Sequence, residues 1–246
     1  MDVDPLLARA RGLWELLAAQ PVSFPSRGGL SVVTSPGSRL CPPSWAGVVE
    51  LGGSAIVTAP DRRSARMLRR ALSTVPPGTR TDADALRRVL PVAEVLGPAA
   101  LAYLADGDFR PSPGERVDAL DPRHPGLGEL TRSVGEEGSN ESGIEDVTSP
   151  VFVVRDGSVV VAAAGYRTWP GATAHLSVLT DQRLRGRGLA RRVASAAVAH
   201  ARADGLLPQW RARPETSRRV ARSLGFRDLG SQLSLRPEFG DPARER

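Results

Sequence analysis

The segment VLTDQRLRGRGLA, residues 178–190, joins a run typical of a β-strand to a long alanine-rich run typical of a helix. Between the two lies a turn that contains Gly186 and Gly188, with arginines on both sides. Glycine lets successive backbone N–H groups approach a phosphate without interference from a Cβ atom. The N-terminus of the following helix adds partial positive charge, and arginine adds charge-assisted donors. This combination favours a diphosphate-binding site over a tight structural turn.

The elements around this segment predict an α+β or α/β domain with a mixed sheet. Valine-rich runs on both sides of Asp156-Gly157 predict a hairpin, because Asp-Gly is a strong signal for a two-residue turn. The predicted strands span 151–155, 158–167, 174–180, 207–212 and 231–236, and the predicted helices span 187–203 and 215–224. The order is therefore β-β-β-α-β-α-β, in which strands and helices share one core.

Two motifs carry a resemblance to a known family. RLRGRGLA, residues 183–190, resembles the acyl-CoA signature of the GCN5-related N-acetyltransferase (GNAT) superfamily, whose consensus is Arg/Gln-x-x-Gly-x-Gly/Ala. SRRVARSLGF, residues 217–226, resembles the second helix of that family, which ends in Leu-Gly-Phe before the final strand. The resemblance is specific over about 151–236, is looser back to about residue 108, and does not extend to residues 1–105.

The resemblance implies a site for acetyl-CoA, the acyl donor, between two strands that splay apart. It assigns to this cofactor Val178, Leu179 and Thr180 along the pantetheine arm, Arg183, Arg185, Gly186, Arg187, Gly188, Leu189 and Ala190 around the pyrophosphate, and Ser217 on the second helix. On their own, Val178 and Leu179 are equally typical of an ordinary core strand. Both interpretations can hold together, because the cofactor would use backbone atoms and the core would use side chains.

Two positions depart from the family pattern. Pro214 stands where members often have an asparagine that helps to hold the pantetheine, and Ala221 stands where many place a tyrosine general acid. Losing that acid removes a modest catalytic contribution. The thiol of CoA, with a pKa of about 8.5, can still leave partly as the thiolate. The departures keep open an alternative function, a catalytically weak GNAT-fold module that binds CoA or regulates a partner.

Candidates for catalysis and acceptor binding are fewer. His175, three residues before Val178, is the best-placed base, and Glu141 could bind or deprotonate a cationic amine. Glu145, Tyr166 and Trp169 are candidates for the acceptor site. The alternatives are a packed or exposed strand histidine, a solvated acidic helix face, and core packing of the two aromatic rings. No His/Cys cluster suggests a metal.

Charge is concentrated in one part of the chain. The formal net charge is +6, and all 33 basic residues are arginines. Residues 182–227 contain twelve arginines against two acidic residues, whereas residues 134–148 contain five acidic residues and no basic one. We interpret the basic part as a site for the cofactor phosphates and the acidic part as facing a cationic acceptor. Nucleic acid is not expected as a partner, because aromatic residues make up 4% and no basic helix resembles a reading motif.

The sequence predicts two domains. Residues 1–106 form an N-terminal α+β domain of unknown role, 107–124 a Pro/Gly-rich linker, 125–238 the GNAT-like domain and 239–246 a disordered tail. The expected N-terminal elements are helices at 5–19, 61–74, 82–90 and 98–106, and strands at 30–35 and 47–59, the latter a hairpin around two glycines. This domain could be a degenerate second GNAT-like half or an unrelated lid or dimerisation domain.

The remaining expectations concern location and partners. The first residues are acidic rather than basic, and no apolar run approaches the ~20 residues that span a bilayer, so we expect a cytoplasmic protein without membrane contact. A single cysteine, Cys41, excludes an internal disulfide framework. The predicted activity is an N-acyltransferase that moves an acetyl group to a small-molecule or peptide amine by direct attack. A homodimer is left open.

Overall fold

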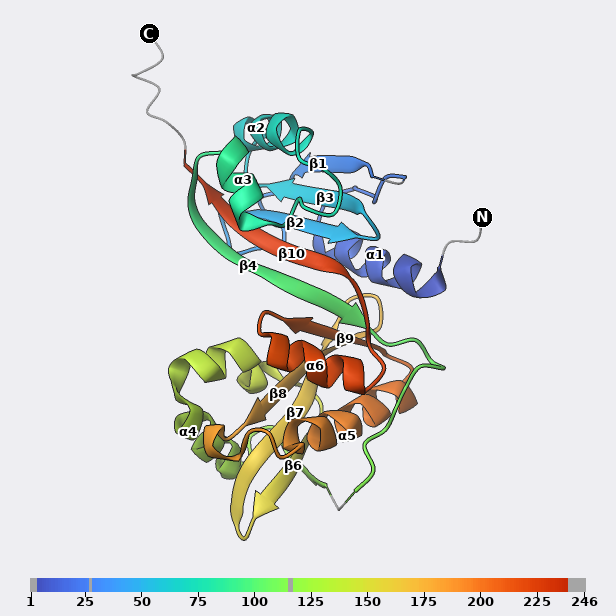
Figure 1. Cartoon of the computed structure of the whole chain (residues 1–246), viewed down its shortest axis with the longest axis vertical. Coiled ribbons are helices and arrows are strands. Elements are labelled where there is room, and N and C mark those ends of the chain that lie inside the picture. The colour runs from blue at the N-terminus through green and yellow to red at the C-terminus, as the bar shows by residue number, and fades with distance from the viewer. Residues whose placement is uncertain (1–3, 27, 115–116, 239–246) are drawn as a thin grey trace. The chain divides into compact units, whose positions relative to one another are not determined.

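The computed structural model describes residues 4–26, 28–114 and 117–238, and for residues 136–141 it describes the backbone alone. The chain divides into two compact units. The first comprises residues up to 101 together with those from 228 on, and the second comprises 102–227 (Figure 1). The predicted tail, 239–246, lies outside the described residues. No helix of the described residues is long and apolar enough to cross a bilayer.

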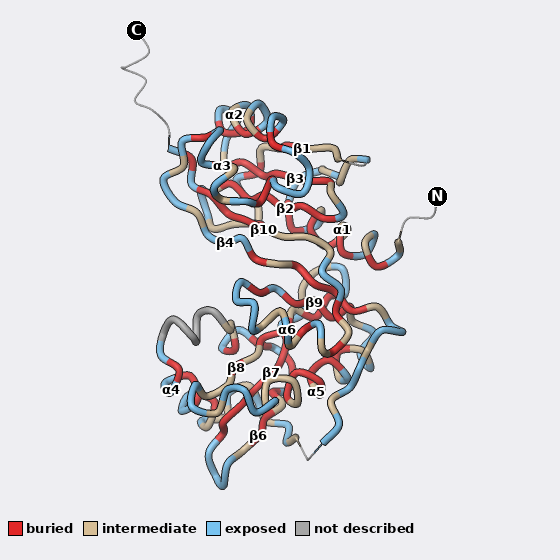
Figure 2. The backbone as a smooth tube through the Cα atoms, viewed as in Figure 1, coloured by how far each residue is buried: buried red, intermediate tan, exposed pale blue. Residues whose placement is uncertain are grey.

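The first unit is a mixed sheet with helices. Its elements are α1 (Pro5–Leu17), β1 (Leu30–Thr34), β2 (Ala46–Leu51), β3 (Ser54–Ala59), α2 (Arg62–Leu72), α3 (Ala83–Val89), β4 (Val92–Tyr103) and β10 (Arg227–Pro237). The strand order is β1-β3-β2-β10-β4, with β1 parallel to β3 and with β2 antiparallel to both β3 and β10. Every residue of β2 and β3 is buried (Figure 2).

Local signals explain the helices of this unit. Asp4 caps α1, because its Oδ1 accepts a hydrogen bond from the Leu6 N–H at 3.0 Å, and Pro5 follows at the first helical position. Asp61 caps α2 in the same way, with its Oδ1 accepting from the Ser64 N–H at 2.8 Å. Hydrogen bonds from the Ser64 side chain and backbone lower the pKa of Asp61. The predicted helices at the start of the unit therefore have capped beginnings in the structure.

One element of this unit was predicted wrongly. The segment 98–106 was expected to be a helix because of its proline followed by alanine and leucine, but residues up to Tyr103 belong to strand β4. Leu101, Ala102 and Tyr103 are all buried, so both faces of the strand are covered at this end. Pairing with β10, which no local signal reveals, outweighs the helix propensity of alanine.

The second unit has the predicted mixed α+β architecture. Its elements are β5 (Asp118–Leu120), α4 (Pro125–Ser142), the 3-10 turn η1 (Ile144–Asp146), β6 (Val151–Asp156), β7 (Val159–Trp169), β8 (Thr173–Thr180), η2 (Gln182–Leu184), α5 (Leu189–Ala203), β9 (Leu207–Ala212) and α6 (Glu215–Ser223). Its strand order is β9-β8-β7-β6-β5, antiparallel from β5 to β8 and parallel between β8 and β9.

The sheet of the second unit has a helix layer on each face. Ala162 and Ala164 of β7 pack in the cluster that contains the inner side of α5 and the end of α6. Ala163, between them, packs in the cluster of α4 and η1. Successive residues of a strand point to opposite faces, so α5 and α6 cover one face and α4 covers the other. α4 is interrupted at Gly135, whose φ is 76°.

The boundaries of the units differ from the predicted domains in two places. The last strand, β10, pairs with β2 of the first unit, although it was assigned to the GNAT-like domain 125–238. Part of the predicted linker, 107–124, is strand β5, which is paired with β6. The linker is also fixed by hydrogen bonds, because the Arg110 N–H donates to the Leu224 carbonyl at 3.0 Å and the Ser112 N–H donates to Ser195 Oγ at 2.9 Å.

Candidate functional site

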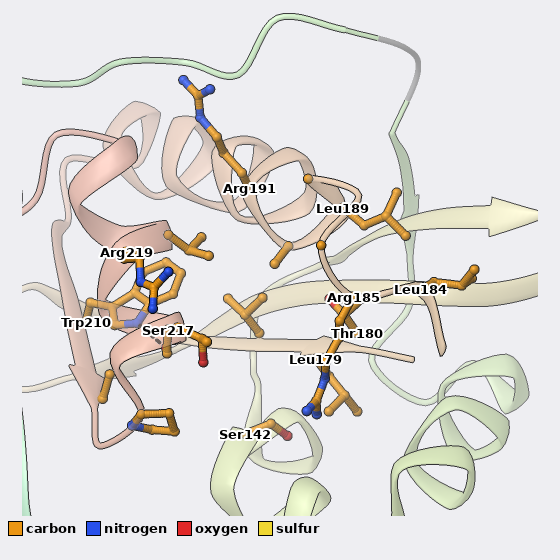
Figure 3. A pocket seen from close by; sticks show the side chains of 18 of the residues that line it. Ser142, Leu179, Thr180, Leu184, Arg185, Leu189, Arg191, Trp210, Ser217 and Arg219 are labelled. Carbon is orange, nitrogen blue, oxygen red and sulfur yellow. Dashed lines mark hydrogen bonds between the residues drawn. The ribbon is translucent and has the colours of Figure 1, made fainter. Parts of the chain in front are cut away.

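A cavity of about 540 Å³ opens between β8, β9, the glycine turn and the N-terminal parts of α5 and α6 (Figure 3). The pairing of β8 with β9 explains why the cavity forms. The parallel pairing of β8 with β9 extends from Thr173 and Leu207 to His175 and Gln209. Beyond that point, Val178 and Trp210 line the cavity from the two strands. The predicted splaying of two strands is therefore present, and it starts at His175.

The glycine turn lines part of this cavity. Gly186 and Gly188 have φ values of 81° and 77°, in the left-handed region where glycine is favoured. A Cβ atom added to either glycine would meet no atom within 4 Å, so the space in front of the turn is open. Gly188 is the N-cap of α5, and no side chain caps this helix among the described residues. Its first backbone N–H groups and its positive end are thus available to an anion.

These features fit a long ligand with a diphosphate. The turn and the start of α5 offer backbone donors, and the side of β8 that no longer pairs with β9 offers both N–H and carbonyl groups. Thr180 Oγ1 is buried in the cavity wall and has no hydrogen-bond partner among the described residues. A buried hydroxyl without a partner is costly, so a ligand that reaches Thr180 would relieve that cost.

Most of the predicted cofactor residues meet in this cavity. Those that line it are Val178, Leu179, Thr180, Arg185, Gly186, Gly188, Leu189, Ala190 and Ser217. Arg183 and Arg187 are exposed and are not among the lining residues. The Arg183 N–H instead donates to Asp181 Oδ1 at 2.8 Å within the turn.

The structure adds lining residues that were not predicted as site residues. They are Ser142, Leu184, Arg191, Trp210, Arg211, Ala212, Pro214, Thr216, Arg219 and Val220. Figure 3 shows the side chain of Arg219 beside Trp210, whereas that of Arg191 points away from the other lining side chains. The i, i+3, i+4 spacing from Thr216 to Val220 was the available signal, because it puts these positions on one face of α6.

Trp210 and Ser217 form a defined pair in the wall of the cavity. The Trp210 Nε1–H donates to Ser217 Oγ at 3.0 Å. The indole is 4% exposed and packs edge-on against Phe226, with ring centroids 5.5 Å apart. Ala221, one helical turn after Ser217, is 1% exposed and lies in the core. The tyrosine of the family pattern thus has no counterpart on this face of α6.

His175 lies at the branch point of β8 and β9 and is not among the cavity-lining residues. Its Nδ1 is hydrogen bonded to Gln209 Oε1, and its ring stacks on that of Trp169 with centroids 4.0 Å apart. Burial lowers the pKa of His175 to about 4, the Gln209 hydrogen bond opposes this, and the positive charges of Arg211 and Arg167 lower it further. His175 is therefore neutral at pH 7, with Nδ1 engaged.

Tyr166 lies on the other face of the sheet from His175. Its hydroxyl is 2.8 Å from His200 Nδ1 and donates to Asp204 Oδ2, also at 2.8 Å. Burial and the Asp204 carboxylate raise the pKa of Tyr166. The tyrosine packs against α5 in the core rather than against the cavity, because its position in β7 alternates with that of Arg167.

The acidic candidates lie on α4 and η1. Glu145 is exposed on η1, and the side chain of Glu141 lies outside the described residues. The neighbouring Asp146 is 4.0 Å from the guanidinium of Arg167, and its charge acts on His175. Trp169 and Asp146 thus lie near His175, and none of the three residues lines the cavity. In the described part of the chain, no three His, Cys, Asp or Glu side chains form a group that could hold a metal ion.

Comparison with solved structures finds several GNAT proteins. A GNAT-family protein from Novosphingobium aromaticivorans is 25% identical, with 58% of this chain and 65% of that chain covered and a TM-score of 0.46. An acetyltransferase from the GNAT family of Colwellia psychrerythraea is 13% identical, with 73% and 75% covered and a TM-score of 0.48. yncA from Salmonella typhimurium, solved with its cofactor acetyl-CoA, is 17% identical, with 52% and 96% covered and a TM-score of 0.38.

These likenesses have TM-scores below 0.5, and the chain spans 65% of the length of the Novosphingobium protein. No curated protein matches the chain. The family model of the GNAT acetyltransferases matches residues 151–231, which include β8, the glycine turn, α5, β9 and α6. Residues 151–231 of this chain, which carry nearly all of the cavity lining, are therefore the part that matches the GNAT acetyltransferase family.

Proposed function

We propose that this chain is an acyl-CoA-dependent N-acyltransferase that moves an acetyl group from acetyl-CoA to an amine by direct attack. The observation that carries the proposal is the cavity between β8 and β9, which ends at the glycine turn and the uncapped start of α5. An apolar slot with amide-binding edges and an anion site at one end matches the chemistry of a pantetheine arm joined to a pyrophosphate.

Each part of the cavity has a distinct task in this proposal. The backbone of β8 at Val178 to Thr180 binds the pantetheine amides, and the N–H groups from Gly186 to Ala190 hold the pyrophosphate. Arg185, whose side chain lies near Leu179 and Thr180 in the view of Figure 3, adds positive charge to the lining of the cavity. When bound, acetyl-CoA supplies an activated thioester. A backbone N–H near Val178 stabilises the negative charge that develops on the carbonyl oxygen.

His175 is the proposed proton acceptor. Its Nδ1 is engaged by Gln209, so the lone pair for a proton is on Nε2. A pKa of about 4 makes it too weak a base to deprotonate a free ammonium group. It can accept the much more acidic proton that the nitrogen carries once it has bonded to the carbonyl carbon. The acceptor, a small-molecule or peptide amine, must therefore arrive with its nitrogen uncharged.

Thermal denaturation with acetyl-CoA tests cofactor binding. A ligand at 100 times its Kd stabilises the native state by about 2.7 kcal/mol, so the melting temperature should rise. Gly186→Glu should abolish the rise, because the side chain would enter the open space before the turn and place a negative charge there.

Gly205→Glu is the matched control for this test. Gly205 also has a left-handed φ, 71°, and open space around a Cβ, but it follows the opposite end of α5. This variant should lose some stability and keep the ligand-induced rise. Absence of a rise in the unmutated protein would contradict the proposal.

A screen for release of free thiol, with acetyl-CoA and pooled amines, tests turnover. The chain's single thiol gives little background, since burial raises the pKa of Cys41 to about 11. Release that depends on one amine, and that His175→Ala reduces, supports the acyltransferase. Binding of acetyl-CoA without release from any pool would favour the alternative that Ala221 and Pro214 suggest, a CoA-binding regulatory module.

A further inference from the structure

We infer that Ser217 is the group that stabilises the departing thiolate, in the role that Ala221 cannot fill. The inference rests on the proposed function. Ser217 lines the cavity from the first turn of α6, and Figure 3 places it between Trp210 and the cavity. Ala221 follows one turn later on the same face, and its methyl group is packed in the core.

The hydrogen bond with Trp210 decides which way the serine can act. An indole N–H is a donor only, so Ser217 Oγ must be the acceptor in the 3.0 Å contact. The hydroxyl proton is therefore not used by Trp210. Among the described residues, Ser217 Oγ has no other hydrogen-bond partner. The result is a fixed oxygen whose proton is free to be donated toward the cavity.

Trp210 holds this donor in place as a positioning residue. Its ring is buried and rests edge-on against Phe226, so the N–H direction is set by the core of the second unit. A hydroxyl held in this way needs little reorganisation when charge appears beside it. The location of Ser217 in the first turn of α6 adds the positive end of the helix dipole in the same direction.

The reaction needs no side chain that protonates the departing sulfur. The amine nitrogen bonds to the carbonyl carbon, the C–S bond breaks, and its electron pair stays on sulfur. The proton of the amine passes to His175 or to water. Ser217 keeps its own proton and donates a hydrogen bond to the thiolate, which takes a proton from water after release. Hydrogen bonds to charged acceptors are about twice as strong as those between neutral groups.

The test is the pKa of the thiol of CoA while it is bound, followed by the ultraviolet absorbance of the thiolate during a pH titration. A donor to the thiolate lowers this pKa, so Ser217→Ala should raise it by about one unit, and Ser217→Thr, which keeps the hydroxyl, should leave it low. Ser223→Ala, a change of the same type on α6 outside the cavity, should have no effect.

Ser217→Ala leaves the buried Trp210 N–H without an acceptor and could fail to fold. The double variant Trp210→Phe/Ser217→Ala removes both partners, keeps an aromatic ring, and should show the same rise in the thiol pKa. An unchanged thiol pKa in a folded variant that lacks the Ser217 hydroxyl overturns the inference. Failure of the unmutated protein to bind CoA would instead overturn the proposed function, so the two failures are distinguishable.

Discussion

His175 is hydrogen bonded to Gln209 and stacked on Trp169. Its burial makes the folded protein less stable at low pH. Burial lowers its pKa from 6.5 to about 4 in the folded protein. The unfolded chain therefore binds the proton more readily than the folded one. Neutral His175 contributes stability above pH 6.5, and that contribution is lost as the pH falls from 6.5 toward 4.

We expect His175→Gln to flatten this part of the stability profile. The unmutated protein should lose up to roughly 3 kcal/mol more unfolding free energy between pH 7 and pH 4 than the variant does. Urea denaturation at a series of pH values measures the unfolding free energy of both proteins. The carboxylates are the same in both, so their contribution cancels in the difference between the two profiles. Two parallel profiles would show that His175 is protonated in the folded protein as easily as in the unfolded chain.

Ser217 and Trp210 show how a single residue escapes sequence-based prediction. Ser217 could be placed near the cofactor from its position in the second helix, but its acceptor role depends on a tryptophan seven residues earlier. Trp210 lies on the same face of the sheet that α5 covers, and the local sequence does not reveal which face that is. Such information is contained in the packing and not in the spacing of residues.

Among the elements, those with strong local periodicity were predicted well. The helix predicted at 187–203 is α5, Leu189–Ala203, and the strand predicted at 207–212 is β9. The glycine turn was predicted because two glycines between a strand and a helix allow a phosphate to approach the backbone, and the structure adds that both have a left-handed φ. Strand β4 was missed, because its partner β10 is more than a hundred residues away and alanine favours a helix locally.

The end of α6 depends on one glycine. Gly225 has a φ of 99°, and a Cβ atom there would lie 1.9 Å from the Asp108 carbonyl oxygen. Gly225→Ala should therefore lower the unfolding free energy by more than about 3 kcal/mol, through both backbone strain and collision with another backbone segment. Chemical denaturation of the purified variant measures this loss.

Gly205→Ala separates the two causes. Its φ of 71° carries a similar strain, but a Cβ would meet nothing within 4 Å. We expect a loss of about 1 kcal/mol, from the conformation alone. Equal losses at Gly205 and Gly225 would mean that the segment around Asp108 moves aside at little cost.

At the scale of the whole molecule, the family segment and the compact units do not coincide. The family model ends at residue 231, inside β10, and β10 belongs to the sheet of the first unit. A substitution in β10 should therefore disturb residues at the beginning of the chain. Leu233 is completely buried there and pairs with Val48 of β2.

Leu233→Asp tests this assignment. An unpaired charge in that core should cost at least about 4 kcal/mol and open the first unit to protease, with cleavage between residues 4 and 101. Arg236→Ala, in the same strand, removes only an exposed pair with Glu94 and should cost no more than about 1 kcal/mol. Mass spectrometry of the fragments identifies the unit that opens. Cleavage confined to 102–227 would contradict the strand order.

The place of β10 between β2 and β4 sets the order in which the chain can mature during its synthesis. Domains generally fold as they leave the ribosome, the N-terminal one first. Here the residues made first cannot complete their sheet until residue 237 has been added, whereas 102–227 is continuous and complete earlier. Until then β2 and β4 each present an unpaired edge, the kind of surface that recruits other strands. The unit of residues 102–227 is thus able to form before the first unit, and the nascent first unit is the part that needs protection.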